Sequence, residues 1–155
     1  MNETLRRGTV DDAPDIANFQ VAMAMETESK TLCGETVLTA VKSVCSDPRK
    51  GFYLVADHDN VVVGSLLITY EWSDWRNSNM WYIQSVFVDP QHRRKGVFQR
   101  LYHKVVELAK SEGVSYVRLY VETENENAQR TYERLGMKRM PYVMYDVKIS
   151  KTKLS

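Results

Sequence analysis

The spacing of apolar residues differs before and after one basic turn, and this difference constrains the fold more than any other feature. Residues 80–88, MWYIQSVFV, form a continuous apolar run that is typical of a buried strand. Residues 97–108 then repeat apolar side chains at helical spacing, which gives a helix with one apolar stripe. The stripe consists of Val97, Leu101, Val105 and Leu108. Residues 114–123 are again rich in β-forming side chains, so the order predicts a strand–helix–strand unit.

The rest of the chain supplies further strands and helices around this unit. Two segments with β-forming residues flank the turn HDN and predict a hairpin. The other expected elements are a strand at 4–9, helices at 9–23, 35–47 and 125–136, and a last strand at 142–149. The fold class is therefore α+β: a central, mostly antiparallel twisted sheet of six to seven strands with helices on both faces.

Length and composition set the class of protein. A chain of 155 residues predicts a single domain over residues 1–150, followed by a flexible tail at 151–155. The two cysteines are too few for a disulfide framework or a zinc site, so no metal is expected. The N-terminus has no apolar signal core and no segment is long enough to span a membrane. We therefore expect a cytoplasmic protein without a membrane partner.

The basic turn lies where the apolar strand ends and the helix begins. Arg93, Arg94 and Lys95 precede Gly96, yet the net charge of the whole chain is only +1. A near-neutral chain disfavours nucleic acid as a partner, because binding along a phosphate backbone requires a broad basic surface. The N-terminus of a helix can bind a phosphate through its N–H groups, and glycine permits close approach of the backbone. Taken alone, the turn is more typical of a solvated loop than of a phosphate site, since it lacks the full pattern of a Walker or dinucleotide-binding loop.

Two separated motifs resemble those of the GNAT acetyltransferases. The first is V-x-P-x-x-R-x-x-G-V-x-x-x-L over residues 88–101, and the second is NAQRTYERLGM over residues 127–137. The predicted order of elements is also similar to the family fold along nearly the whole chain. The resemblance implies acetyl-CoA as cofactor, with CoA as product. One position departs from the family pattern, because Phe98 stands where glycine or alanine is usual.

The resemblance also implies which residues contact the cofactor. In this family the strand equivalent to residues 80–88 splays from its parallel neighbour, and the pantetheine arm lies between them. Backbone N–H groups of the strand, the basic turn and the second motif would then hold acetyl-CoA. The implied cofactor-binding residues are Val86, Phe87, Val88, Arg93, Arg94, Lys95, Gly96, Val97, Phe98, Asn127 and Tyr132. Tyr132 would also protonate the departing thiolate as the general acid.

The general base and the acceptor pocket are less well defined by the sequence. Many family members carry a glutamate on the strand before the turn, but this chain has Gln84 there, which cannot accept a proton. Candidates for the base, directly or through a relaying water, are Glu26, Glu28, Glu71, Asp74 and Glu122. Aromatic and acidic side chains in METES and EWSDW suit a cationic amine. The candidate acceptor-binding residues are Glu26, Glu71, Asp74, Trp75 and Gln84, although the EWSDW segment is also compatible with a hairpin loop that packs on the sheet or on a partner.

These features predict an N-acetyltransferase that moves the acetyl group of acetyl-CoA to a primary amine. The amine belongs to a small molecule or a peptide and attacks directly in a ternary complex. The alternative is a non-catalytic module that binds an acyl-CoA as a sensor or interaction partner. The aromatic-rich surface and the expected last strand are compatible with a homodimer.

Overall fold

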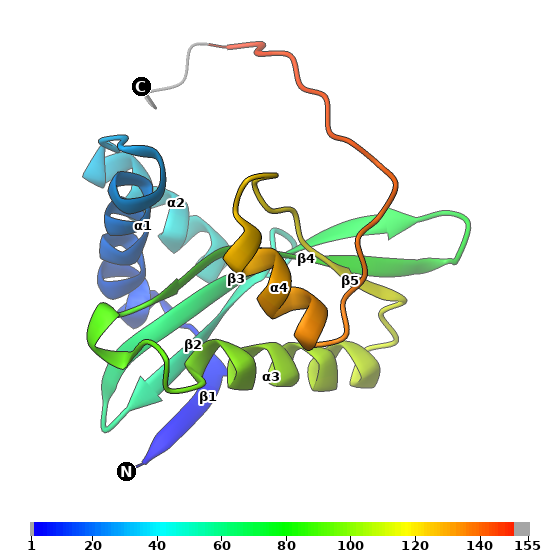
Figure 1. The fold of residues 1–155 in the computed structure, drawn as a ribbon. Coiled ribbons are helices and arrows are strands. Elements are labelled where there is room, and N and C mark those ends of the chain that lie inside the picture. The colour runs from blue at the N-terminus through cyan, green and yellow to red at the C-terminus, as the bar shows by residue number, and fades with distance from the viewer. Residues whose placement is uncertain (1, 151–155) are drawn as a thin grey trace. The chain divides into compact units, whose positions relative to one another are not determined.

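The computed structural model describes residues 2–150, which fall into two units (Figure 1). The first unit covers residues 2–119 and the second covers residues 120–150. The elements of the first are β1 (Glu3–Arg7), α1 (Ala13–Glu28), α2 (Gly34–Ser46), β2 (Phe52–His58), β3 (Val61–Ser73), β4 (Ser78–Val88), α3 (Val97–Ser111) and β5 (Tyr116–Arg118), with short 3-10 helices η1 (Val10–Asp12) and η2 (Pro90–His92). The second contains α4 (Glu126–Arg134). The expected flexible tail, residues 151–155, lies outside the described residues.

The strands of the first unit form one mixed sheet in the order β1-β2-β3-β4-β5. The first three pairings are antiparallel, and β4 pairs with β5 in parallel. The α+β class and the mostly antiparallel sheet are confirmed, but the sheet has five strands among the described residues rather than six to seven. The expected strand at 142–149 lies in the second unit, where the structure assigns no strand to these residues. A strand needs a neighbour as well as a suitable sequence.

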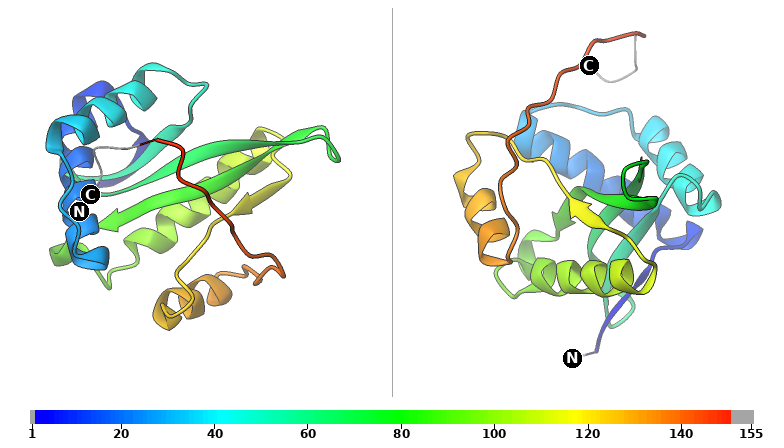
Figure 2. Two further views of the ribbon diagram at one scale, coloured as in Figure 1. Left: turned by 90° about the horizontal axis from the view of Figure 1, so that it is seen from above. Right: turned by 90° about the vertical axis from the view of Figure 1, so that its right-hand side faces the viewer.

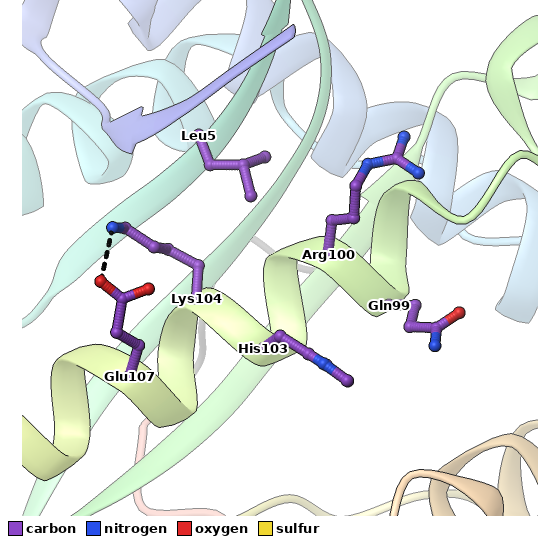
Figure 3. Close-up of a pocket in the computed structure, with 6 residues that line it drawn as sticks. All are labelled: Leu5, Gln99, Arg100, His103, Lys104 and Glu107. Carbon is purple, nitrogen blue, oxygen red and sulfur yellow. Dashed lines mark hydrogen bonds and ion pairs between the residues drawn. The ribbon is translucent and has the colours of Figure 1, made fainter.

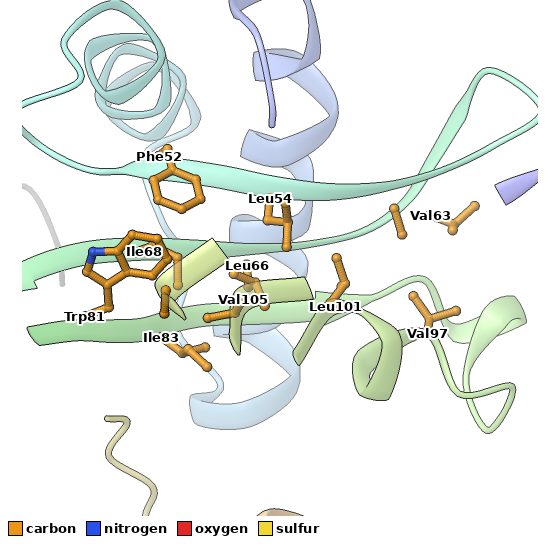
Figure 4. Packing of buried hydrophobic residues seen from close by; sticks show 12 residues of the cluster. Phe52, Leu54, Val63, Leu66, Ile68, Trp81, Ile83, Val97, Leu101 and Val105 are labelled. Atoms are coloured by element: carbon orange, nitrogen blue, oxygen red, sulfur yellow. The ribbon is translucent and has the colours of Figure 1, made fainter. Parts of the chain in front are cut away.

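Helices cover both faces of this sheet, as Figure 2 shows from two sides. Alternation along β2 sends Phe52 and Leu54 into the core beneath α3, while Tyr53 and Val55 pack against α1 and α2. The buried face of α3 consists of Val97, Leu101, Val105 and Ala109. Figure 4 shows the first three of these residues within the core cluster. The expected apolar stripe is thus confirmed, with Leu108 half-buried beside Ala109 because the helical period of 3.6 carries the stripe slowly around the helix.

A buried carboxylate fixes the start of α1 to the sheet. Asp12 is 7% exposed and accepts two hydrogen bonds from the Arg6 guanidinium, at 2.8 and 2.9 Å. It also accepts one from the backbone N–H of Thr9 at 2.7 Å, while Arg6 reaches Asp57 at 3.0 Å. The Arg6 guanidinium beside it lowers the pKa of Asp12 below its usual value. This cluster joins β1, β2 and the first turn that leads into α1.

We expect Asp12→Asn to lower the free energy of unfolding by about 1–3 kcal/mol at neutral pH, because it removes the buried carboxylate that pairs with the half-buried Arg6 guanidinium. The folded-state pKa of Asp12 is depressed, so its contribution is present above the unfolded pKa and is lost as pH falls through the folded pKa. Urea unfolding at pH 7 and in acid measures this. The difference in free energy of unfolding between wild type and variant should shrink in acid. A difference that does not change with pH would contradict a stabilising role for the Asp12 carboxylate.

Candidate functional site

Strand β4 leaves its parallel neighbour after only three residues. Met80, Trp81 and Tyr82 pair with residues 116–118 of β5, and β4 then continues to Val88. Over residues 83–88 no strand of the described part of the chain pairs with this side of β4. The backbone along this stretch is a free edge of the sheet, and the strand ends just before the basic turn.

A β-bulge interrupts β4 on this free stretch. The ladder pairs Ser65 with Phe87 but Leu67 with Gln84, so Leu66 faces two residues, Ser85 and Val86. Ser85 has a φ of 52°, a left-handed conformation that is uncommon for a residue with a side chain. A bulge unpairs backbone groups and redirects a strand, and such features concentrate near functional sites.

The direction of the N–H groups follows from the ladder beyond the bulge. The N–H of Asp89 donates to the carbonyl oxygen of Val63 at 2.8 Å. Because hydrogen-bonded and non-bonded pairs alternate in an antiparallel ladder, the N–H of Phe87 points toward β3. The N–H group of Val88 therefore points to the free edge, while the bulge interrupts the alternation at Val86. A free donor at this edge can bind an extended ligand as an additional strand would.

The basic turn has the geometry of an anion-binding loop. After η2, Arg94 and Gly96 adopt left-handed conformations, with φ values of 60° and 78°. Gly96 is the N-cap residue of α3, and no side chain caps this end of the helix. The first turn of an α-helix presents N–H groups that no helical carbonyl accepts, together with the positive end of the helix dipole. This end of α3 can therefore bind a phosphate.

Arg93 supports the turn rather than adding a charge to it. Its Nη1 and Nη2 donate to the two carboxylate oxygens of Glu26 at 2.6 and 2.9 Å, and its Nε donates to the carbonyl of Val88 at 2.8 Å. The guanidinium lies 5.2 Å from the ring centre of Phe87, and that ring stacks on Phe19 of α1. The turn is thus tied to both β4 and α1.

The other cationic side chains in and beside the turn differ in whether a carboxylate neutralises them. Arg100 forms an ion pair with Glu3 and donates to the carbonyl of Lys95 at 2.9 Å. Arg94 and Lys95 are exposed and form no ion pair within residues 2–150. Their positive charges are therefore available to an anion at the N-terminus of α3.

A cavity of about 330 Å³ lies beside α3, on the side of β1 (Figure 3). Its lining consists of Leu5, Gln99, Arg100, His103, Lys104 and Glu107. Lys104 pairs with Glu107 at 3.1 Å and Arg100 pairs with Glu3, so its main charges compensate one another. No residue of the free edge of β4 lines this cavity, which separates it from the turn's backbone.

Three candidate residues for proton transfer and acceptor binding, Glu26 and Glu28 on α1 and Gln84 on β4, have different surroundings. The Arg93 guanidinium lowers the pKa of Glu26, which makes this carboxylate a weaker base. Glu28 is exposed and lies 3.7 Å from the Lys30 ammonium. Gln84 donates from Nε2 to the hydroxyl of Thr69 at 2.6 Å, so its orientation on β4 is fixed.

The EWSDW segment forms the far end of the β3–β4 hairpin. Trp75 is 89% exposed there, with Asp74 beside it, whereas Trp81 is buried and packs edge-on against Phe52. The tryptophans therefore do not form one cluster. Glu71 is five residues from Leu66 along β3, a rise of about 17 Å. A side chain at that distance does not reach a group held at the bulge.

The second motif forms α4 and the residues around it. Asn125 is the N-cap, because its side chain accepts from the N–H of Ala128 at 3.2 Å, and the side chain of Asn127 accepts from Arg130. Tyr132 lies on α4 and is half-buried. Burial raises the pKa of Tyr132 above the usual value for a phenol, so the hydroxyl keeps its proton at neutral pH. This is the state that a general acid requires.

Sequence reasoning missed two features of the site. The Arg93–Glu26 pair joins residues 67 positions apart, and nothing in the local pattern of either residue indicates the other. The bulge at Ser85 also lacks a signal, since no glycine or proline stands in QSV. Gly96 is the local sequence signal for the turn, and it lies at the N-terminus of α3, where the sequence predicts it.

Comparisons with known proteins agree on one family. Residues 18–137 match the model of the Acetyltransferase (GNAT) family. A solved structure of a possible acetyltransferase from Clostridium difficile 630 is 41% identical, with a TM-score of 0.92, and the match covers 97% of this chain and 100% of that one.

Two curated relatives match over part of their length. A thialysine N-epsilon-acetyltransferase from Bos taurus is 35% identical over 48% of this chain and 44% of its own length. A mycothiol acetyltransferase from Gordonia bronchialis is 29% identical over 85% of this chain and 42% of its own length. This chain thus spans less than half of each of these curated relatives.

Two further features are absent from the part of the chain that the structure describes, a membrane-spanning helix and a metal-binding cluster. No helix between residues 2 and 150 is both long and apolar enough to cross a membrane. The same part of the chain contains no group of three or more histidine, cysteine or acidic side chains arranged to hold a metal ion.

Proposed function

This chain belongs to the GNAT acetyltransferase family, and from that premise we propose that it transfers the acetyl group of acetyl-CoA to a primary amine. One observation carries the proposal. The free edge of β4 runs directly to an uncapped helix N-terminus that has two uncompensated cations beside it. An extended, partly peptide-like arm that ends in a diphosphate matches this arrangement in shape and in charge.

The diphosphate of acetyl-CoA is held at the turn in this proposal. The N–H groups at Gly96, Val97 and Phe98 and the charges of Arg94 and Lys95 supply the contacts. Hydrogen bonds to a charged group contribute about 1.5–3 kcal/mol each, so several of them dominate the affinity. The ring of Phe98 packs against the core cluster, 6.4 Å from the ring of Tyr102. The Phe98 side chain therefore packs within the protein, and the backbone N–H of Phe98 can donate to the diphosphate.

The pantetheine arm pairs with the free edge of β4. The N–H of Val88 points to that edge and the N–H of Phe87 belongs to the ladder with β3. The N–H of Val86 is proposed to point to the same edge. A donor at the bulge can bond the thioester oxygen and stabilise the negative charge that develops there during attack. In this proposal the chemistry takes place beside the bulge, and the left-handed Ser85 serves to aim the Val86 donor.

The amine attacks the thioester carbon directly, and the thiolate leaves as CoA. Tyr132 donates its proton to the sulfur, which the raised pKa of its hydroxyl supports. The amine must lose a proton, and Gln84 cannot take it. The pairing of Glu26 with Arg93 lowers its basicity, so water is proposed to relay the proton to an exposed carboxylate such as Glu28.

The acceptor is proposed to be the primary amine of a small molecule or a peptide. The thialysine acetyltransferase that this chain resembles is named for acetylation of an ε-nitrogen, which is a primary amine. A panel of amines with acetyl-CoA tests the proposal, with release of the CoA thiol and the mass of the acetylated product as readouts. Thiol release without a new acetyl-amine, or no release with any amine, would favour the alternative of an acyl-CoA-binding module without transfer.

We expect the double variant Arg94→Ala/Lys95→Ala to bind acetyl-CoA about tenfold more weakly, since each exposed charge contributes up to about 1 kcal/mol. Its affinity should also depend less on salt, because the lost contacts are ionic. The matched control is Lys104→Ala/Lys110→Ala, which removes two charges from α3 outside the turn. Calorimetric titrations at low and high salt measure both. Equal losses in the two double variants would mean that only net charge matters.

A further inference from the structure

Strand β1 is the first strand in the sheet order, and no strand of residues 2–119 pairs with its outer side. Its inner side pairs with β2 in an unbroken register, from Glu3 opposite His58 to Arg7 opposite Leu54. An edge strand carries a row of unpaired N–H and C=O groups that can pair with a further strand. The outer side of β1 is therefore a candidate interaction surface of the first unit.

Two hydrogen bonds at the ends of this ladder show which residues of β1 direct their backbone groups outward. The N–H of Gly8 donates to the carbonyl oxygen of Tyr53 at 2.8 Å, and the N–H of Asp59 donates to the carbonyl oxygen of Asn2 at 3.1 Å. Both pairs continue the register between β1 and β2, so the even-numbered residues bond to β2. Because the two kinds of pair alternate, the odd-numbered residues direct their N–H and C=O groups to the open edge. These residues are Glu3, Leu5 and Arg7.

The side chains of the same three residues lie on the α3 side of the sheet. Leu5 packs against the core cluster beneath α3, Glu3 pairs with Arg100 near the start of that helix, and Arg7 pairs with Glu112 just after its end. Helix α3 therefore runs alongside β1 in the same direction. The cavity beside α3 is lined by Leu5 from β1 and by side chains of α3 (Figure 3).

We propose that β1 of one copy of this chain pairs antiparallel with β1 of a second copy, about a two-fold axis at Leu5. In this register Leu5 lies opposite the partner's Leu5, and Glu3 lies opposite the partner's Arg7. Each of these pairs can exchange two backbone hydrogen bonds, because all three residues direct both of their backbone groups outward. Opposite charges directly across a strand pair also stabilise it. The result is a closed two-fold dimer with one sheet that runs through both copies.

The charges of β1 select this register and a second copy as the partner. An axis at Arg6 would place Arg6 opposite the partner's Arg6, and like charges opposite each other destabilise a strand pair. An axis at Thr4 would set Glu3 against the partner's Leu5 and leave Arg7 without an opposite residue in β1. Only the axis at Leu5 matches both charged ends at once. The sequence ETLRR is thus complementary to itself in the antiparallel direction.

The same arrangement covers the cavity beside α3. Because α3 runs along β1, the two-fold axis sets the α3 helices of the two copies antiparallel, one on each side of the axis. Lys104 and Glu107 line the cavity and lie between the levels of Arg100 and Glu112, so they are close to the axis. Lys104 of one copy can therefore meet the partner's Glu107. This inference does not depend on the acetyltransferase proposal.

Light scattering on the purified full chain tests the dimer, with an expected wild-type mass of twice the 18.0 kDa of one chain. Glu3→Arg and Arg7→Glu each place like charges opposite one another at both ends of the strand pair, so each should weaken the dimer about tenfold or more. An equal mixture of the two variants restores both opposite-charge pairs, but only between unlike chains. The mixture should therefore dimerise as the wild type does. Each variant also disturbs an ion pair within its own chain, which mixing does not repair, so recovery reports contact between chains. A wild-type mass of 18.0 kDa across micromolar concentrations, or a mixture that dimerises no better than its components, would overturn the proposal.

A second pair of variants tests the backbone hydrogen bonds at the axis. Leu5→Pro removes the outward N–H, whereas Leu5→Ala shortens the side chain and keeps that donor. The proline variant should dimerise about 100-fold more weakly than the alanine variant, since the symmetric dimer loses a donor from each copy. Both should unfold at the same urea concentration, because proline is tolerated on an edge strand where the N–H faces outward. Equal dimer affinities, or a proline variant that is less stable than the alanine variant, would overturn the proposed pairing.

Discussion

Gly96→Glu is expected to weaken acetyl-CoA binding at least about 100-fold, the largest effect predicted for a cofactor contact. Gly96 has a φ of 78° and forms the N-cap of α3, so its backbone borders the site assigned to the diphosphate. A Cβ would lie 2.9 Å from Nη1 of Arg100, whose flexible end can move aside. The carboxylate would then occupy the positive end of the helix and repel the diphosphate. Calorimetric titration with acetyl-CoA measures the loss.

The same helix supplies a matched control for this substitution. Gly113 follows the C-terminal end of α3, has a φ of 70°, and has open space where a Cβ would lie. Gly113→Glu therefore carries a similar backbone strain, about 1–2 kcal/mol, and the same added charge. It should bind acetyl-CoA like the wild type. If both variants lost binding equally, the effect would be one of stability, and the turn would not be the cofactor site.

Tyr132→Phe is expected to lower kcat by about 10²- to 10⁴-fold, the range for loss of a positioned general acid. The phenyl ring keeps the packing of the half-buried side chain, so the Kd for acetyl-CoA should change little. Burial raises the pKa of the Tyr132 hydroxyl, which keeps it protonated up to and beyond the usual pKa of tyrosine. The alkaline fall of kcat in the wild type should therefore begin above that usual value. The rate with an acceptor amine from the panel, measured across pH, checks both statements.

Tyr120 provides the control for this change. It is 58% exposed, and Tyr120→Phe removes a hydroxyl from the same unit of the chain. We expect its kcat to match the wild type. A Tyr132→Phe variant with wild-type kcat would remove Tyr132 from the mechanism, and the acetyl transfer would then need another proton donor for the sulfur.

The parts of the fold that the sequence predicted correctly are those whose signal is local. Helix α3 is amphipathic along its whole length, and the hairpin of β2 and β3 is marked by a turn between two β-rich segments. Strand β5 and residues 142–149 are different, because a strand exists only where a neighbour completes its hydrogen bonds. A single sequence shows that a segment favours the extended conformation, but it does not show whether a partner strand is present.

The residues of the candidate site also separate into those with a local sequence signal and those that depend on long-range contacts. The position of Gly96 between a strand and a helix follows from the local pattern and is confirmed by the structure. The role of Arg93 does not, because its partner Glu26 lies on α1 and meets it only through the fold. Glu71 and Trp75 look close to the strand in the sequence, but the hairpin carries them along its length and away from the bulge.

The most direct test of the central claim compares two ligands on the wild-type protein. Acetyl-CoA and S-acetylpantetheine share the thioester and the pantetheine arm, and only acetyl-CoA carries the diphosphate. If the turn at residues 93–98 is a diphosphate cradle, calorimetry should show acetyl-CoA binding at least about 100-fold more tightly, the equivalent of about two charged hydrogen bonds. Equal affinities would contradict the account, because the basic turn would then contribute nothing to recognition of the cofactor.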